Sequence, residues 1–415
     1  MPRLDSKFMV IALSVLILLY FIVLPLAVLI IDSVVVDGHL DVSSYLTVYG
    51  QAVNMRALTN TAKISILVMI LSVLITFPLA WLIGRTDLPG RKKFRTILVA
   101  SYMIPPYVGA IAWTQLLNPD VGYLNALLKT IFSLSKAPFN IYTEGGLIWV
   151  LIPLLFPFAF YYHFPCHVKM DPTLKNASRV SGASPLRVLW DVTLPLMAPS
   201  ILAGGLLVFI GAGSAFGIPA IVGMPGNIEV LTTRIVSFVY MGNDSGIRNA
   251  TTLAVSLMIL ANGLLFFMTW FMGRKDYTTI GGKSTRPALV ELGKWKGLAT
   301  FLVAVYAFIA VILPLGSIVI TSFMVSMSKG LSLDNFGFDA WIPVLENSQY
   351  LDCIWRSLGY AFIAATIGTI LSLFVAYLSV KIAREGAQSP RSACDGRRQY
   401  AQRCYCTGSH HNLLG

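Results

Sequence analysis

Apolar residues in this chain gather into long runs, and short polar segments separate one run from the next. A helix needs roughly 20 apolar residues to cross the hydrocarbon core of a bilayer. The sequence therefore predicts an all-α, polytopic transmembrane helix bundle of about eight spans. We place these spans near residues 8–31, 58–84, 97–117, 145–166, 199–223, 251–273, 298–323 and 357–380.

Composition supports a membrane protein and excludes a water-soluble one. Of the 415 residues, 56% are hydrophobic and only 12% are charged. Soluble domains usually carry about twice that charged fraction. The first run, 8–31, is too long for the apolar core of a signal peptide and lacks a small-residue cleavage site, so we interpret it as an uncleaved first span.

The net charge is +12, and the distribution of the basic residues among the loops indicates how the chain is oriented in the membrane. Lys and Arg are frequent in the segments 85–95, 169–187 and 274–296. The alternate loops hold fewer basic residues, namely Arg56, Lys129, Lys136, Arg234, Arg248, Lys329 and Arg356. Because basic loops stay on the cytoplasmic side, we expect a multi-pass protein of the bacterial inner (plasma) membrane with a cytoplasmic N-terminus. This pattern argues against nucleic acid as a partner.

Two parts of the chain resemble each other. Leu24-Pro25-Leu26 in the first span matches Leu313-Pro314-Leu315 in the seventh, and a second pair of matches links the second and eighth spans. An internal repeat of this kind predicts two copies of one bundle. We divide the chain into a first repeat at 1–290 with about six transmembrane helices, the beginning of a second repeat at 291–386 with about two, and a tail at 387–415.

The tail differs in composition from everything before it. It is rich in Arg, Ser, Cys, Gln and His and has no apolar run. The change comes in the middle of a loop, at a point where the first copy continues into its third span. We interpret 387–415 as a tail foreign to the repeat, the result of a truncation or frame shift in the second copy; a long cytoplasmic extension is the alternative.

A polar loop at 171–197 has the pattern of two short helices. Gly182 allows a bend between them without steric cost. Pro185 suits the first turn of the second helix, and Leu194-Pro195 is predicted to end it before the fifth span. Ala177 and Ser178 are small enough to let another surface approach closely.

This loop resembles the EAA loop of ABC importer permeases, which has a Glu-Ala-Ala triplet, a glycine soon after it, and a Leu-Pro near its end. Here Asn176-Ala177-Ser178 replaces the triplet, so the glutamate of the family is absent. The remaining matches are Gly182, Ala183, Leu194 and Pro195. The resemblance implies that the loop docks on a separate ABC ATPase subunit, and that a periplasmic solute-binding protein delivers substrate at the opposite face.

A narrower resemblance to ferric iron permeases with two fused halves rests on two regions, 85–125 and 211–236. Their most specific segments are Arg85-Thr86-Asp87-Leu88-Pro89-Gly90-Arg91, Ile104-Pro105-Pro106-Tyr107, Phe216-Gly217-Ile218-Pro219-Ala220 and Val230-Leu231-Thr232-Thr233-Arg234-Ile235. The resemblance implies ferric iron as the substrate. Similar permeases carry aminoethylphosphonate, polyamines or thiamine, and these remain alternatives.

Candidates for the translocation path are helix breaks and small residues. Pro105 and Pro106 should break the third span near its start because neither donates a backbone hydrogen bond. Gly213, Phe216 and Gly217 are placed on the fifth span, which lines the path in the family that the chain resembles. Simple packing is an equally good interpretation of each glycine taken singly.

No catalytic residue, cofactor site or metal site is predicted. Gly281-Gly282-Lys283-Ser284 lacks the first glycine of a phosphate-binding loop, because Tyr277 stands there, so ATP hydrolysis is assigned to another subunit. The cluster of His163, Cys166 and His167 has no carboxylate and is interpreted as structural. An ion-coupled secondary transporter is disfavoured by the lack of acidic residues within the spans. An inactive truncated remnant is a further alternative.

Overall fold

The computed structural model describes residues 15–17, 19–36, 38–170, 177–273, 289–329 and 332–386. It divides into two compact units, a larger one at Leu29–Trp341 and a smaller one formed by Met1–Val28 with Ile342–Gly415. Among the described residues, seven helices are long and apolar enough to cross a membrane, or eight if one sharply bent pair counts as a single span. This confirms the predicted all-α polytopic architecture. The only strands in the described part are β1 (Val35–Val36) and β2 (His39–Leu40), which pair antiparallel.

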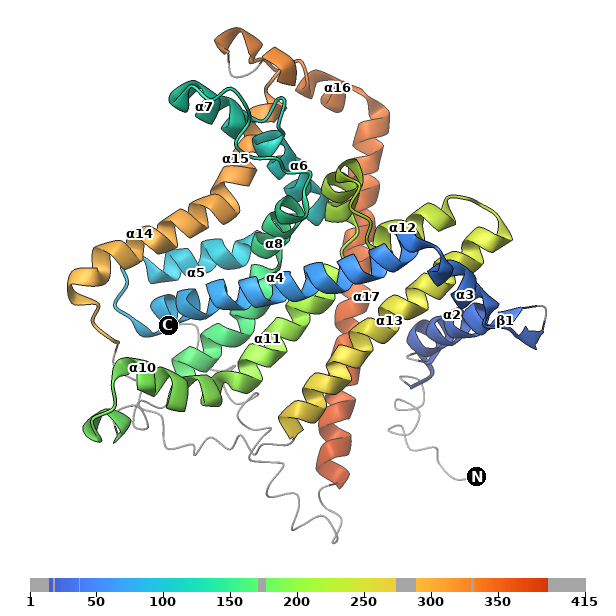
Figure 1. Ribbon diagram of the computed structural model, residues 1–415, viewed down its shortest axis with the longest axis horizontal. Helices are drawn as coiled ribbons and strands as arrows, with labels where there is room; N and C mark the ends of the chain where they lie inside the picture. The colour runs from blue at the N-terminus through green and yellow to red at the C-terminus, as the bar shows by residue number, and fades with distance from the viewer. Residues whose placement is uncertain are drawn as a thin grey trace. The chain divides into compact units, whose positions relative to one another are not determined.

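Three long helices form the centre of the larger unit. They are α4 (Ala52–Arg85), α8 (Glu144–Lys169) and α11 (Leu194–Ser214). Each packs against the other two along much of its length (Figure 1). The remaining helices of this unit are α3 (Ser43–Gly50), α5 (Arg91–Ala100), α6 (Pro106–Leu117), α7 (Tyr123–Phe132), α10 (Pro185–Val188), α12 (Leu231–Val239), α13 (Asp244–Gly273), α14 (Lys296–Ala307) and α15 (Leu313–Ser322).

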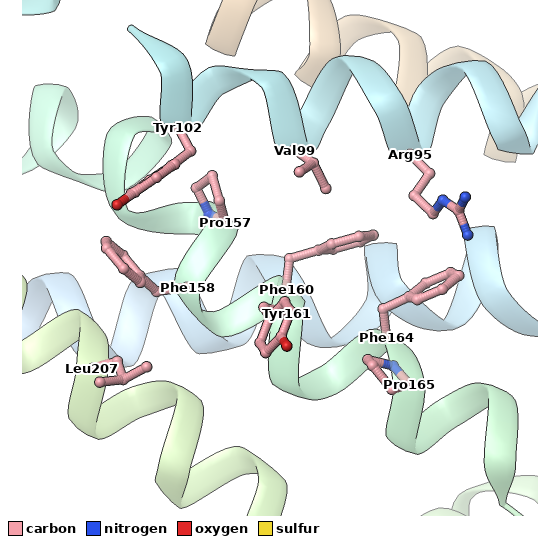
Figure 2. Close-up of a pocket in the computed structure, with 10 residues that line it drawn as sticks. All are labelled: Arg95, Val99, Tyr102, Pro157, Phe158, Phe160, Tyr161, Phe164, Pro165 and Leu207. Carbon is pink, nitrogen blue, oxygen red and sulfur yellow. The ribbon is translucent and has the colours of Figure 1, made fainter. Parts of the chain in front are cut away.

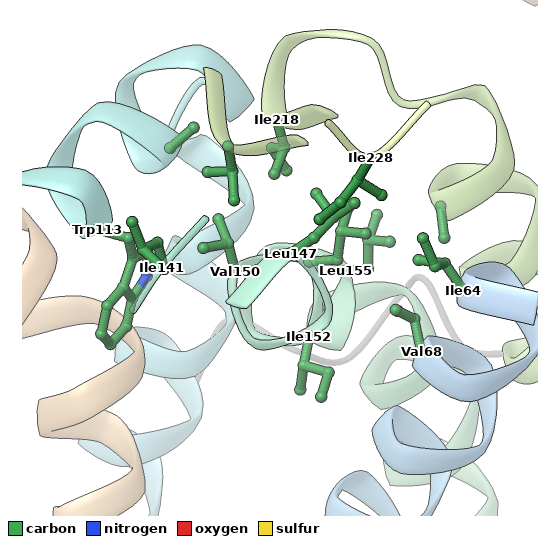
Figure 3. Packing of buried hydrophobic residues seen from close by; sticks show 14 of the residues in the cluster. Ile64, Val68, Trp113, Ile141, Leu147, Val150, Ile152, Leu155, Ile218 and Ile228 are labelled. Carbon is green, nitrogen blue, oxygen red and sulfur yellow. The ribbon is translucent and has the colours of Figure 1, made fainter. Parts of the chain in front are cut away.

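Glycines on α11 set how closely the central helices approach. A Cβ at Gly204 would lie 3.1 Å from the Cα of Ala159 on α8, and one at Gly211 would lie 2.9 Å from Cδ2 of Leu155. Helices in lipid gain little from hydrophobic burial, so close backbone approach at small residues is a principal source of their association. The buried cluster around these contacts includes Leu147 and Val150 of α8 (Figure 3).

The seventh predicted span joins the larger unit. Ala299, Val303 and Ala307 of α14 are buried in one cluster with residues of α4, α5 and α8. Ser317 of α15 donates a hydrogen bond of 3.2 Å to the carbonyl of Ala112 on α6. Helices that the sequence assigns to a second repeat at 291–386 thus pack on helices of the first.

The smaller unit consists, in its described part, of residues near the N-terminus and one long helix. It contains the π turn η1 (Leu19–Val23), the start of α2 (Leu24–Val34), most of α16 (Trp341–Glu346) and α17 (Ser348–Gly386). The predicted tail at 387–415 lies outside the described residues.

The same local conformation recurs at the two places that the sequence matched as a repeat. The π turn η1 directly precedes Leu24-Pro25, and the π turn η7 (Phe308–Ile312) directly precedes Leu313-Pro314. Within a regular α-helix, a proline ring clashes with the carbonyl four residues before it. A π turn adds one residue to that turn and so moves the carbonyl away from the ring. A short helix and a long helix follow in both cases, α3 with α4 and α16 with α17. The division into two repeats remains a prediction that this recurrence supports.

The remaining elements of the described residues are short irregular helices. They are the 3-10 helices η2 (Ser101–Met103), η5 (Met224–Gly226), η6 (Gly293–Trp295), η8 (Met327–Lys329) and η9 (Leu333–Asn335), and the π turns η3 (Leu189–Thr193) and η4 (Pro219–Gly223).

Candidate functional site

The predicted coupling loop forms a sharp elbow that begins with a helical turn at 177–180. The N–H of Gly182 donates to the carbonyl of Arg179 (2.9 Å), and the N–H of Ala183 donates to that of Ser178 (3.1 Å). Together with φ of +83° at Gly182, these two bonds form a Schellman motif, which closes the end of a helix. The bend predicted at Gly182 is confirmed. Asn176 and the rest of 171–176 lie outside the described residues.

The second arm of the elbow begins with a side-chain cap. The Oγ of Ser184 accepts a hydrogen bond of 3.3 Å from the N–H of Arg187, and Pro185 occupies the first turn as predicted. An N-cap serine satisfies a backbone donor that has no partner within the helix. The arm therefore has a defined start.

Leu194-Pro195 does not end this arm, so that prediction was wrong. The helical conformation continues from Pro185 through the π turn η3 to Ser214, a single stretch of 30 residues. The N–H of Leu194 donates to the carbonyl of Leu189, five residues back, and this wider turn accommodates Pro195. The fifth span thus runs from Pro185 to Ser214, where the sequence predicted 199–223.

The elbow carries exposed apolar side chains that the sequence interpretation missed. Val180, Leu186 and Trp190 have exposed fractions of 89%, 70% and 68%. Leu186 and Trp190 are four residues apart and share one helix face, while the ion pair between Arg187 and Asp191 (3.2 Å) occupies the adjoining face. The four-residue spacing was visible in the sequence and could have identified this surface, which we call the elbow face (Val180, Leu186 and Trp190).

The predicted break in the third span is confirmed. Helix α5 with η2 and helix α6 meet at an angle of 103°. Pro105 is the N-cap residue of α6 and Pro106 stands at its first position, where a missing N–H costs nothing. The first arm begins at Arg91, six residues before the predicted start at 97.

The remaining path candidates fall into two places. Gly213 lies on α11, where a Cβ would meet the Oγ of Ser65 on α4 at 3.3 Å. Phe216 and Gly217 lie beyond the end of α11 at Ser214, so their assignment to the fifth helix was wrong. The helix stops because the chain becomes extended at Ala215, whose carbonyl accepts a hydrogen bond from Thr232 Oγ1 at 2.8 Å.

Gly217 contacts the broken span. A Cβ at Gly217 would lie 2.8 Å from Cδ2 of Tyr107, the residue that follows Pro106. Phe216 is partly exposed beside it. The structure therefore brings Pro105, Pro106 and Gly217 to one place and Gly213 to another.

The segment after α4 ties distant parts of the larger unit together. Arg85 is buried and its Nη1 donates to the carbonyl of Met170, at the end of α8 (3.2 Å). Lys296 Nζ lies 2.9 Å from Oδ2 of Asp87, and the N–H of Leu292 donates to Oδ1 at 3.0 Å. These bonds lower the pKa of Asp87 below its ordinary value, the Lys296 hydrogen bond contributing most.

The loops that contact each other are those that the charge pattern places on the same side of the membrane. At one end Arg85, the last residue of α4, contacts Met170, and Arg85 and Asp87 contact the segment before α14. At the other, Lys63 forms an ion pair of 2.7 Å with Glu144. The predicted alternation of loops agrees with these contacts.

The histidine cluster belongs to the packing of α8. His163 and His167 are buried, and their rings approach Phe77 of α4 edge-on at centroid distances of 6.4 and 5.0 Å. Within the described residues, no group of three or more His, Cys, Asp or Glu is placed to hold a metal ion.

The fold and this arrangement define a polytopic helical membrane protein with an exposed elbow at one end. No protein-family model matches the chain. It is 26% identical to a ferric transport system permease protein of Haemophilus influenzae over 396 residues, covering 92% of this chain and 60% of that protein. It is 32% identical over 194 residues to an inner membrane ABC transporter permease of Escherichia coli, covering 42% of this chain and 62% of that protein.

A solved structure agrees on the fold. The chain matches a chain of a bacterial ABC transporter involved in the import of the acidic polysaccharide alginate, with a TM-score of 0.55 and 18% identity, covering 65% of this chain and 96% of that chain. The chain is therefore similar in sequence to transport-system permeases and similar in fold to a chain of a bacterial ABC transporter, and its described residues hold several helices able to cross a membrane. The chain spans 60% of the length of its Haemophilus relative.

Proposed function

We propose that the chain is the membrane-spanning permease of an ATP-driven importer, that it receives its substrate from a periplasmic solute-binding protein, and that this substrate is ferric iron. The observation that carries the proposal is the elbow at 177–195. It is exposed, defined by a Schellman motif and a serine cap, and it presents Leu186 and Trp190 to a partner. Aromatic side chains of this kind commonly anchor protein interfaces.

The elbow connects directly to the helix core, which supports a role in transmitting force. A stretch of 30 helical residues from Pro185 to Ser214 is about 45 Å long at 1.5 Å per residue. Its far end leads into Gly217, which packs on Tyr107 beside the broken third span. A partner that moves Trp190 would therefore shift contacts at Pro105-Pro106, where the helix is already interrupted.

Orientation follows from charge. The face with the elbow and the basic segments would be cytoplasmic, and the N-terminus would lie on the same side. The ATPase would then bind the elbow face, and the solute-binding protein would bind at the end where Lys63 pairs with Glu144. Energy would enter through the elbow, since this chain carries no complete phosphate-binding loop.

Ferric iron is supported by two observations. The Haemophilus relative is named as a ferric transport permease. In addition, the segments Arg85–Arg91 and Ile104–Tyr107, on which the narrower resemblance rests, form the junction and the broken helix described above. Iron would be cargo, so resident metal ligands are not required of this chain.

Docking is tested by site-directed crosslinking in native membrane vesicles. Cysteine is placed at Trp190, and at Trp295 as a control of matched exposure (68% and 67%). We expect the first variant to capture an ABC ATPase and the second to capture none. Equal capture at both positions, or none at Trp190, would refute the docking assignment.

Substrate and energy source are tested together by uptake into vesicles that hold the assembled transporter. Radiolabelled ferric iron should enter with ATP and stop without it while the proton gradient is kept. If an excess of aminoethylphosphonate, a polyamine or thiamine inhibits the uptake of iron, that solute and not iron would be identified as the substrate. Uptake that survives the loss of ATP would instead indicate an ion-coupled carrier.

A further inference from the structure

A groove of about 550 Å³ lies between α5 and α8 in the larger unit. Figure 2 shows its walls: Val99 and Tyr102 lie above, Phe160 and Phe164 of α8 lie below, and Leu207 of α11 stands at one side. The lining is almost wholly apolar and aromatic. Arg95 is the charged residue among those that line it, at the end opposite Tyr102.

A second hollow of about 210 Å³ adjoins the charged end. Arg95 and Phe164 line both spaces, so the two lie next to each other. Arg91 and Lys92 add two further cations to the smaller hollow. The guanidinium of Arg95 lies 5.5 Å from the centre of the Phe164 ring, which holds it at the boundary between the apolar and the basic part.

The basic end has an excess of positive charge. None of the ion pairs found among the described residues includes Arg91, Lys92 or Arg95. The nearby carboxylate of Asp87 is already bound by Lys296 and Leu292. These cations also stand on the first turns of α5, whose cap residue Gly90 offers no side chain to the free N–H groups. Cations at a helix N-terminus interact unfavourably with the helix dipole. An anion bound at this end would neutralise the excess positive charge and interact favourably with the dipole.

We propose that this groove binds an anionic phospholipid, with its phosphate at Arg91, Lys92 and Arg95 and part of one acyl chain along Phe164, Val99 and Tyr102. The distance from Arg95 to Tyr102 is about 10 Å along the helix, enough for a segment of acyl chain. Basic hollows between membrane helices on the cytoplasmic side are suited to acidic headgroups. A free phosphate would leave the aromatic groove unfilled, and a covering protein helix would need acidic groups to match the three cations.

The experiment measures retained lipid on the purified full chain. Protein is exchanged into nanodiscs of phosphatidylcholine with a minor fraction of phosphatidylglycerol, and bound lipid is counted by native mass spectrometry. We expect Arg95→Gln to reduce the preference for phosphatidylglycerol by about fivefold, the contribution of one basic residue near an anionic surface. Lys93→Gln removes the same charge from the same helix but lines neither space, so it should leave the preference intact.

Two further variants keep the test informative if Arg95→Gln disturbs its contact with Phe164. Lys92→Gln should reduce the preference without touching that ring. Val99→Trp fills the groove and should lower retention of both lipids, whereas a site for headgroups alone would be unaffected. An equal loss with Lys93→Gln, or glycerol phosphate competing as well as the lipid does, would overturn the proposal. So would crosslinking of a cysteine at Val99 to another protein chain in place of lipid.

Discussion

Asp87 and Lys296 are 209 residues apart in the sequence, and their side chains meet at 2.9 Å. The carboxylate also accepts from the N–H of Leu292, and the preceding residue, Thr86, pairs with Val290 as an isolated β-bridge. The beginning of the seventh span is therefore tied to the loop that follows the second. Arg85 extends the same junction to Met170, immediately before the segment that leads to the elbow.

Asp87→Asn should lower the melting temperature of the purified protein, and the difference should depend on pH. Because the folded-state pKa of Asp87 is lowered from 3.8, its stabilising effect is fully present above that value and is lost as pH falls through the folded pKa. The gap between wild type and variant should stay constant from pH 8 to pH 5 and close below about pH 4. Thermal melts in detergent across this range measure it.

Asp352→Asn is the matched control for that experiment. Asp352 forms a long ion pair of 3.9 Å with Arg356, and both side chains are well exposed. Exposed pairs of this kind contribute about 0–1 kcal/mol. If Asp352→Asn changed the melting temperature as much as Asp87→Asn does, with the same dependence on pH, the stabilising role assigned to the Asp87–Lys296 ion pair would be contradicted.

Leu186→Ala and Trp190→Ala should weaken binding of the ATPase without changing the melting temperature. Both side chains are exposed in this chain, so truncation leaves its core untouched. Anchor residues at interfaces typically contribute about 1–2 kcal/mol or more, which corresponds to at least a fivefold to thirtyfold loss of affinity. Binding of detergent-solubilised chain to immobilised ATPase measures the change, and Trp295→Ala should have no effect.

Gly182→Ala should loosen the elbow for a conformational reason. A Cβ at this position would meet nothing within 4 Å, so space is not limiting, but φ is +83°. A left-handed conformation costs a residue with a side chain about 1–2 kcal/mol. Hydrogen exchange at the amides of positions 182 and 183 should accelerate by roughly fivefold to thirtyfold.

Gly182→Asn should behave closer to wild type, because asparagine adopts this conformation more readily. Exchange at the Schellman amides that is unchanged by Gly182→Ala would show that the turn does not hold the elbow.

Gly217→Ala should destabilise the protein through a steric clash. The added methyl would lie 2.8 Å from Tyr107, and overpacking of this kind costs about 1–3 kcal/mol. Tyr107→Ala in the same chain should recover most of the loss, because it removes the atom that the methyl meets. Gly263→Ala, where nothing lies within 4 Å, should not destabilise. Additive effects of the two substitutions in thermal melts would contradict the contact.

Features that depend only on neighbouring residues, such as the number of spans and the bends of the backbone, could be predicted from the sequence alone. The number of spans follows from apolar length, because lipid offers no partners for free backbone groups. The bend at Gly182 and the break at Pro105-Pro106 follow from what one residue permits its own backbone to do. For the same reason these features hold whatever surrounds them.

Predictions failed where a neighbouring turn or a distant residue decided the outcome. Pro195 was predicted to end a helix, but the π turn before it allows the helix to continue to Ser214. Gly217 reads as part of the fifth helix, yet the chain leaves that helix at Ala215 and packs on Tyr107.

Only the tertiary structure showed that Asp87 meets Lys296 and that Arg95 stands at the mouth of an aromatic groove. The sequence by itself determined about how many membrane-spanning helices to expect and that the backbone bends at Gly182 and Pro105-Pro106, since both depend on residues close together. Which distant side chains share a junction, a groove or an exposed face was decided by packing between helices, and no local pattern encodes it.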